Sequence, residues 1–259
     1  MKFIKSIIAA FRFLTVLPIP VNTTLAHLEN SIGWFPLAGA AVGLITVAVF
    51  KFGAVFFPPS LVPALTILAY IILTRGFHLD GFADTIDGFF SGKDRSTILK
   101  IMKEPNLGTF AVLGIGTWFL ICYGGFPYLY LSDFIIIHTY SRFSILLLPL
   151  LFSYPRESGT GKFFVDHVTW KTLLTGFLIT ALITIGMNFI PASPLRAYYP
   201  ILALLSVAVA LLTGYWSKKK IGGITGDVLG FVIEINHILF IITILFTYKK
   251  FNLIPQLGV

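Results

Sequence analysis

The sequence has little charge for its length. Only 12% of its 259 residues are Asp, Glu, Lys or Arg, while 56% are apolar. A soluble domain usually has about 25% charged residues. The low charge therefore excludes an ordinary soluble globule, which could not cover its surface with so few charged side chains.

Cysteine is also scarce. Cys122 is the single cysteine, which excludes a disulfide within the chain and a cysteine-rich zinc site. We expect no cleavable signal peptide, because a charge interrupts the first apolar stretch and no A-x-A site follows it. That stretch suits a helix lying in the membrane interface, or the first turns of a spanning helix, with its basic residues on one side: Lys2, Lys5 and Arg12.

Long uncharged runs are what the sequence has in abundance. Residues 30–50, 52–74, 105–132, 172–195 and 197–217 contain no Asp, Glu, Lys or Arg. Each run exceeds the roughly 20 residues that a helix needs to cross a bilayer. We therefore predict an all-α fold, a polytopic transmembrane bundle in a single domain over 1–259. Its seven spans are predicted near 32–50, 61–78, 108–125, 133–152, 172–190, 199–216 and 228–247.

The basic residues favour one orientation of this bundle. With the N-terminus inside, 14 Lys and Arg residues fall in inner segments and 4 in outer ones, and Arg142 lies within a span. Positive residues concentrate on the cytoplasmic side of membrane proteins. This bias predicts a cytoplasmic N-terminus and explains the net charge of +8 without nucleic acid as a partner. Lys249 and Lys250 do not fit this bias, because they fall in an outer segment.

The densest patch of ionisable residues lies at 75–108. Asp80, Asp84 and Asp87 are spaced i, i+4, i+7, so on a helix they share one face, and Asp94 would join them if the helix continued. Like charges this close repel unless a cation lies among them. Carboxylates are ligands that Mg²⁺ prefers, commonly together with substrate phosphates. The alternative is a solvated loop whose acids pair with its bases, but ionisable residues next to a span are functional by default.

Basic residues follow the aspartates directly. Metal-binding carboxylates beside cations for phosphate are the arrangement that phosphoryl transfer requires. Arg75 and His78 precede the motif, and His78 suits a general base, a substrate contact or a hydrogen-bonded interfacial histidine. The basic residues that follow the aspartates are Lys93, Arg95, Lys100 and Lys103.

A second polar patch lies at 218–237. Asp227 and Glu234 share a helix face, and the glycines before them loosen a loop whose amides could bind phosphate. Thr225 could instead cap the helix. Glu234 falls inside a predicted span and needs a partner such as a metal, Arg142 or His237, so site membership and a structural ion pair both remain open.

Four segments carry a resemblance to a known family. HLDGFADTIDGFFSGKDRSTILKIMK, FRFLTVLPIP, GWFPLAGAAVGLI and GGITGDVLGFVIE resemble the cobalamin synthases, or adenosylcobinamide-GDP ribazoletransferases, in the same order and over nearly the whole chain. The segment MKEPNLG departs from the family, since Asn106 stands where a basic residue is expected. Asn106 replaces that contact in our predicted site.

The resemblance implies a Mg²⁺-dependent enzyme of the last steps of cobalamin synthesis. Such an enzyme joins adenosylcobinamide-GDP to α-ribazole or its 5′-phosphate, releases GMP, and faces the cytoplasm from the inner membrane. Homo-oligomers, or contacts with other cobamide-assembly enzymes, are compatible with it. Combined with the residue patterns, it predicts metal ligands at Asp80, Asp84, Asp87 and Asp227, and a proton acceptor at Asp87 or His78. The predicted substrate contacts are Arg75, Lys93, Asp94, Arg95, Lys103, Asn106, Arg142, Thr225 and Glu234.

Two other function classes fit parts of the sequence. A cation-coupled secondary transporter also carries acids on membrane helices, but it should place them near the bilayer midplane in related halves. Here the acids gather at one end and no repeat is visible. A non-catalytic membrane scaffold leaves the shared aspartate face unexplained.

Overall fold

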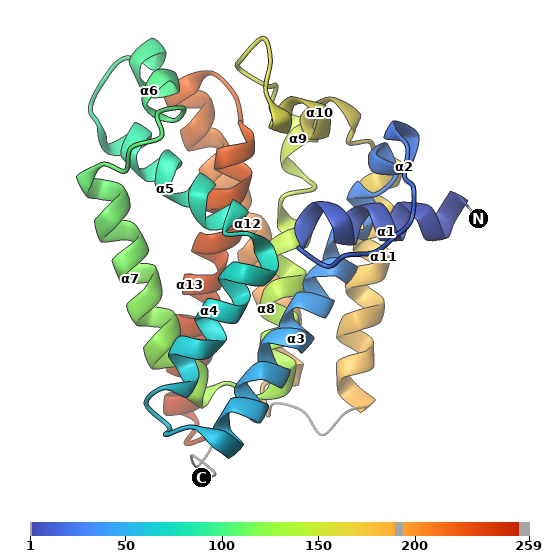
Figure 1. Cartoon of the computed structure of the whole chain (residues 1–259), viewed down its shortest axis with the longest axis vertical. Helices are drawn as coiled ribbons and strands as arrows, with labels where there is room; N and C mark the ends of the chain where they lie inside the picture. The colour runs from blue at the N-terminus through green and yellow to red at the C-terminus, as the bar shows by residue number, and fades with distance from the viewer. Residues whose placement is uncertain (1, 190–193, 254–259) are drawn as a thin grey trace.

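The fold is all-α, as predicted. The computed structural model describes residues 2–189 and 194–253, and within them it contains helices and no strand (Figure 1). The α-helices are α1 (Lys2–Leu14), α2 (Leu25–Glu29), α3 (Phe35–Phe56), α4 (Val62–Thr74), α5 (Phe77–Phe90), α6 (Arg95–Ile101), α7 (Thr109–Gly125), α8 (Leu131–Ser144), α9 (Leu148–Leu151), α10 (Thr160–His167), α11 (Trp170–Gly186), α12 (Tyr199–Ile221) and α13 (Gly226–Lys250). Short 3-10 turns are η1 (Ile32–Trp34), η2 (Phe126–Tyr128), η3 (Met187–Phe189) and η4 (Arg196–Tyr198).

The helices confirm a polytopic membrane protein. Five helical segments are long and apolar enough to cross a bilayer, and the number rises to seven if each of two sharply bent helix pairs forms one span. The five are Ile32–Phe56, Thr109–Tyr128, Leu131–Leu151, Arg196–Ile221 and Gly226–Lys250.

The second predicted span, 61–78, is not one straight helix. α4 ends at Thr74, and α5 leaves it at an angle of 93°. The residues between them, Arg75 and Gly76, both have left-handed backbones, with φ of 56° and 62°. Left-handed residues end a helix, so two in succession redirect the chain. Because of this turn, α5 and its aspartates do not continue along the axis of α4.

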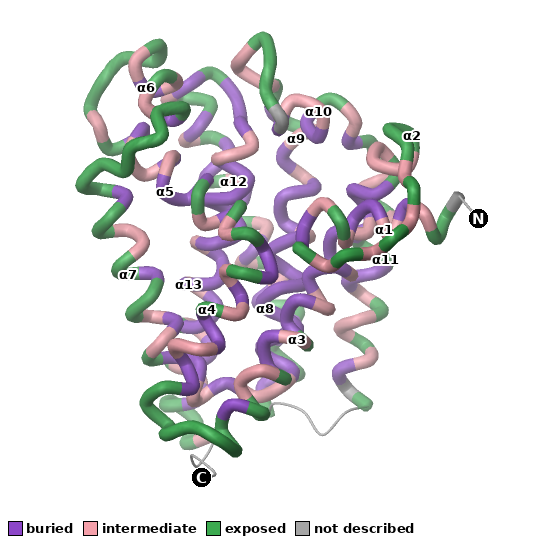
Figure 2. The backbone as a smooth tube through the Cα atoms, viewed as in Figure 1, coloured by how far each residue is buried: buried purple, intermediate pink, exposed green. Residues whose placement is uncertain are grey.

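Two helices form the centre of the bundle. In the most apolar 18-residue stretches of α13 and of the span containing α8, 72% of the residues are buried, against 28% in that of the α7 span. Figure 2 shows α13 and α8 mostly purple and α7 mostly green and pink. α3 lies against α8 at Gly39 and Gly43, where any side chain would collide with the α8 backbone. Small residues at such crossings let membrane helices approach closely.

The polar segments gather at one end of the bundle. α1, α2, α5, α6, α10 and the connection between α12 and α13 lie at this end, and α13 ends at the other (Figure 1). α1 lies across the beginning of α3 rather than along it, as a helix in the membrane interface would. The predicted site residues on α5 and at the start of α13 are therefore at the same end.

Candidate active site

The site begins at the crossing of α5 and α13. A Cβ atom added at Gly81 would lie 2.8 Å from the Cα of Asp227, and one added at Gly230 would lie 2.8 Å from the carbonyl oxygen of His78. Glycine on both helices thus permits backbone contact. Because Gly81 lies between Asp80 and Asp84 in the chain, this crossing brings the first turn of α13 to the aspartate-bearing part of α5.

Three carboxylates lie around this crossing, near enough for their charges to interact. The charges of Asp80 and Asp227 both act on Asp84, which is half-buried, and Asp80 also acts on Asp227. Thr225 caps α13 by accepting a hydrogen bond from the Val228 amide at 3.3 Å, and its hydroxyl donates to Asp227 Oδ2 at 3.1 Å. The threonine thus fixes the carboxylate at the start of the helix.

Arg156 completes the cluster, and the sequence patterns did not single it out. It lies in the loop between α9 and α10, and its Nη1 is 3.2 Å from Asp227 Oδ2. Its Nη2 lies 3.5 Å from the Leu99 carbonyl oxygen on α6, and its buried Nε has no hydrogen-bond partner among the described residues. An arginine fork at carboxylates is suited to a bidentate oxyanion ligand such as phosphate. The signal in the sequence is the polar loop 156–167, which begins with Arg156 and suits either a lid over the site or an ordinary surface loop.

Asp87 is bonded to the beginning of α7, although its charge also acts on Asp84. Its two carboxylate oxygens accept hydrogen bonds from the backbone amides of Gly108 at 2.5 Å and Ala111 at 2.8 Å, at the beginning of α7. A carboxylate at a helix N-terminus satisfies unpaired amides and interacts favourably with the helix dipole. Asp87 is thus engaged by α7, and the convergence of Asp80, Asp84 and Asp87 on one cation stays a prediction.

The remaining carboxylates have the right chemistry for Mg²⁺, but they are too few or too far apart to supply all of its ligands. Among residues 2–189 and 194–253, no three His, Cys, Asp or Glu side chains are close enough to hold a metal ion by themselves. Mg²⁺ is commonly bound by one or two carboxylates, with waters and substrate phosphates supplying the other ligands. Asp80, Asp84 and Asp227 provide hard oxygen donors for that mode.

His78 faces away from this cluster. Its side chain is 3% exposed and lines a small apolar cavity of about 40 Å³, and its Nδ1 has no hydrogen-bond partner among the described residues. The nearby charges that act on it belong to Arg142, Glu234 and His237, not to the aspartates. In this arrangement His78 is not placed to accept a proton from a substrate at the aspartates.

Glu234 and Arg142 belong to a separate, fully buried network. Tyr70 donates a hydrogen bond to Glu234 Oε1 at 2.6 Å, and His237 Nδ1 lies 3.0 Å from Glu234 Oε2. Arg142 Nη1 lies 3.2 Å from His237 Nε2 and 3.0 Å from His138 Nδ1. Glu234 follows Asp227 by two helical turns, about 10 Å along α13. Of the partners predicted for Glu234, the structure places His237 in direct contact.

The predicted basic contacts are divided between two places. Arg95 Nη2 lies 3.5 Å from the Pro155 carbonyl oxygen, so Arg95 is close to the loop that carries Arg156. Lys93, Lys103 and Asn106 are exposed on the segments around α6. Arg75 points to the other side, where it donates hydrogen bonds to the carbonyl oxygens of Arg12 and Thr15.

Asp94 caps α6 and does not extend the aspartate face. Its carboxylate accepts hydrogen bonds from the Ser96 amide at 3.1 Å and from the Thr97 hydroxyl at 2.6 Å. Bonding by the Ser96 and Thr97 hydroxyls lowers the pKa of the Asp94 carboxyl to about 2. The helix that carries Asp80 ends at Phe90, so the continuation that would have aligned Asp94 does not form.

Comparison with known proteins identifies the family. The family model of cobalamin-5-phosphate synthase matches residues 6–245, almost the whole chain. The chain belongs to the cobalamin-5-phosphate synthase family. It is therefore a transferase of cobalamin synthesis, and the cation-coupled transporter considered above is set aside.

Several relatives of this synthase cover nearly its full length. A protein of Chlorobaculum parvum is 35% identical over 246 residues, which are 91% of this chain and 92% of the relative. A protein of Clostridioides difficile is 32% identical, covering 93% of this chain and 96% of the relative, and one of Acetivibrio thermocellus is 32% identical over 93% and 98%. All three are named adenosylcobinamide-GDP ribazoletransferase. No solved structure matches the chain.

Proposed function

We propose that this synthase transfers adenosylcobinamide phosphate from adenosylcobinamide-GDP to α-ribazole, or to its 5′-phosphate, and releases GMP. The observation that carries the proposal is the ion pair of Arg156 with Asp227 at the crossing of α5 and α13, where the charges of Asp80 and Asp84 also act. The full-length relatives named for this activity support the choice of substrates.

The proposed reaction exchanges one bond to phosphorus for another. A ribose hydroxyl of α-ribazole attacks the phosphorus that carries the cobinamide, and the bond from this phosphorus to the bridging oxygen breaks. GMP leaves with that oxygen. The proton of the attacking hydroxyl passes to a carboxylate of the cluster, for which the exposed Asp80 and half-buried Asp84 are the accessible candidates.

The cluster would also hold Mg²⁺ in this proposal. Asp80, Asp84 and Asp227 are the residues that would bind it, and a bound Mg²⁺ supplies positive charge that stabilises the phosphate oxygens as charge develops on them. Arg156 binds and orients a phosphate group. Arg95, which lies beside the same loop, extends the cationic surface.

The location proposed for this site is the cytoplasmic face of the inner membrane. The aspartates lie at the same end of the bundle as α1, α6, α10 and the end of α12, and together with the loops beside them the segments at this end carry 14 of the 19 Lys and Arg residues. Positive residues near span ends concentrate on the cytoplasmic side. The substrates of the proposed reaction would then reach the site from the cytoplasm.

Release of GMP by the purified protein tests the proposal. GMP should form from adenosylcobinamide-GDP only when α-ribazole is present, and EDTA should stop its formation until Mg²⁺ is added back. Asp80→Asn should lower kcat by roughly 10²–10³, the loss typical of removing one group that stabilises the transition state. Glu104→Gln, an exposed acid in the segment after α6, is the control and should keep the wild-type rate.

Two results would contradict this proposal. One is GMP release at the same rate without α-ribazole, which would make the protein a hydrolase. The other is near-normal turnover by well-folded Asp80→Asn, Asp84→Asn and Asp227→Asn proteins, which would remove the carboxylate cluster from the chemistry.

A further inference from the structure

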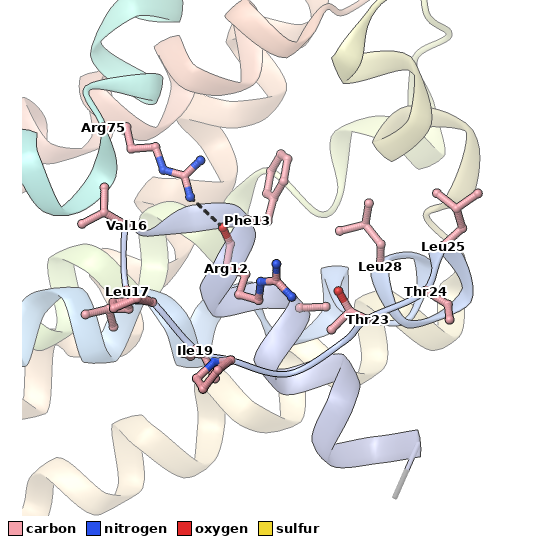
Figure 3. Close-up of a pocket in the computed structure, with 13 residues that line it drawn as sticks. Arg12, Phe13, Val16, Leu17, Ile19, Thr23, Thr24, Leu25, Leu28 and Arg75 are labelled. Carbon is pink, nitrogen blue, oxygen red and sulfur yellow. Dashed lines mark hydrogen bonds between the residues drawn. The ribbon is translucent and has the colours of Figure 1, made fainter.

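A second cavity lies away from the aspartates, beside α1. It is open to the surface, has a volume of about 750 Å³ and is lined by the C-terminal half of α1, the following loop, α2 and the bend at Arg75. Figure 3 shows Arg12 and Arg75 on its wall, with apolar side chains that include Val16, Leu17 and Leu28 around them. The proposed reaction does not use this cavity.

Arg75 is held firmly on the cavity wall. Its Nη2 donates hydrogen bonds to the carbonyl oxygens of Arg12 at 3.0 Å and Thr15 at 2.8 Å (Figure 3 draws the first). Its backbone has φ of 56°, a left-handed conformation that is costly for a residue with a side chain. A backbone hydrogen bond from the Val16 amide to the Leu73 carbonyl oxygen, at 2.8 Å, joins the same two segments. The guanidinium therefore has a fixed position.

Arg12 is placed in the same way. Its Nη1 donates to the Val21 carbonyl oxygen at 2.5 Å, in the loop that lines the cavity. Neither Arg12 nor Arg75 forms a salt bridge within residues 2–189 and 194–253. Each guanidinium has five N–H donors, of which the carbonyl contacts use few. The cavity thus carries two positive charges whose protein partners are neutral.

α1 places this cavity at the depth of lipid headgroups. Phe3 and Ile4 on α1 are 62% and 60% exposed, and the Phe3 ring packs edge-on against Trp34 with 4.6 Å between ring centroids. At 13 residues α1 is too short to span a bilayer, and it lies across the beginning of α3 (Figure 1). An exposed apolar face on such a helix enters the boundary between headgroups and acyl chains.

We propose that this cavity binds the phosphodiester headgroup of an anionic glycerophospholipid. Arg12 and Arg75 bind the phosphate, because guanidinium groups match the geometry of phosphate oxygens. Val16, Leu17 and Leu28 contact the glycerol and the first methylenes of the acyl chains. The bound lipid would join α1 to the bend between α4 and α5, and so to the helix that carries the aspartates.

Titration of the full-length protein with a soluble short-chain phosphatidylglycerol tests this site. The protein is purified in a neutral detergent, and binding is followed by calorimetry and by native mass spectrometry. Arg12→Gln and Arg75→Gln should each weaken binding about fivefold, the factor expected for one basic residue next to an anionic headgroup. Lys100→Gln, an exposed basic residue on α6, is the matched control and should bind as the wild type does.

The comparison ligands separate the sources of phosphate. Short-chain phosphatidylcholine should bind more weakly than phosphatidylglycerol, and inorganic phosphate at the same concentration should not compete. Because Arg75 also holds the end of α1, the Arg12→Gln protein decides the outcome if Arg75→Gln does not fold. Undiminished binding by folded Arg12→Gln, an equal loss in Lys100→Gln, or displacement by inorganic phosphate would each overturn the proposal.

Discussion

Individual carboxylates in this protein have different tasks although their spacing in the chain looks uniform. Asp80 and Asp84 face the start of α13, whereas Asp87, three residues after Asp84, binds the amides of α7. Asp84 and Asp87 are about one helical turn apart and point in similar directions from α5. The role of each carboxylate is therefore set by the helix that packs against it. Arg156, the arginine that we propose to bind phosphate, comes from a loop far from α5 in the chain.

Replacing Asp87 tests its structural role. Asp87→Ala leaves the amides of Gly108 and Ala111 without their acceptor and should destabilise the protein by roughly 1–2 kcal/mol, as the loss of a helix N-cap does. Thermal unfolding in detergent measures the loss, and hydrogen exchange should quicken at the start of α7. Unchanged stability together with a complete loss of Mg²⁺ binding would instead make Asp87 a metal ligand.

At the scale of elements, the crossing of α5 and α13 depends on glycine. Gly81→Val adds atoms where a Cβ alone would lie 2.8 Å from the Asp227 Cα, so the helices must separate. Overpacking of this kind costs roughly 1–3 kcal/mol. We expect a lower melting temperature and a loss of activity, measured by thermal unfolding and GMP release.

A glycine in open space is the matched control for this crossing. Gly116 lies on α7 with nothing within 4 Å of an added Cβ, so Gly116→Ala should be neutral or slightly stabilising. Equal losses in the two variants would show that the contact between α5 and α13 is not what limits stability.

The cap of α6 gives a prediction on pH. The pKa of Asp94 in the folded protein is about 2, below its ordinary value of 3.8, so the ionised cap stabilises α6. The stabilisation is fully present above about pH 4 and is lost as the pH falls through 2. The protection of the Ser96 and Thr97 amides, after correction for the intrinsic exchange rate, should therefore not change between pH 5 and 9 in the wild type.

The same measurement on a variant isolates the cap. Asp94→Ala should quicken exchange of the α6 amides at every pH in that range, because the Ser96 amide loses its acceptor. Asp94→Asn retains an acceptor and should exchange at an intermediate rate. Identical protection in all three proteins would mean that tertiary contacts alone hold α6.

At the scale of the whole molecule, a buried polar network joins three spans. Tyr70 on α4, Arg142 on α8, and Glu234 and His237 on α13 are all in contact and almost fully buried. Glu234→Ala leaves the Arg142 charge without a counter-charge in the bundle and should cost roughly 3–5 kcal/mol. Thermal unfolding and the yield of folded protein measure this loss.

A surface ion pair provides the contrast for that network. Lys162 and Asp166 lie 3.7 Å apart at i, i+4 and are 42% and 47% exposed. Asp166→Ala should change stability by less than roughly 0.5 kcal/mol, because solvent screens an exposed pair. If Glu234→Ala were equally mild, the buried network would not contribute to holding the spans together.

The sequence by itself determined the class of fold and the end of the bundle where the polar residues lie. Uncharged runs long enough to cross a bilayer predict spans, since the cost of burying charge in lipid acts on each segment separately. The i, i+4, i+7 spacing likewise predicted that the aspartates occupy one helix, which α5 confirms. These features are local, so local patterns suffice.

Only the tertiary structure decided which side chains meet. The 93° turn at Arg75 and Gly76, the capture of Asp87 by α7, and the arrival of Arg156 at Asp227 depend on how helices far apart in the chain pack together. The same holds for the cavity between Arg12 and Arg75, whose residues are 63 positions apart. Contacts of this range are set by packing and turn geometry, which the spacing of residues along one helix does not encode.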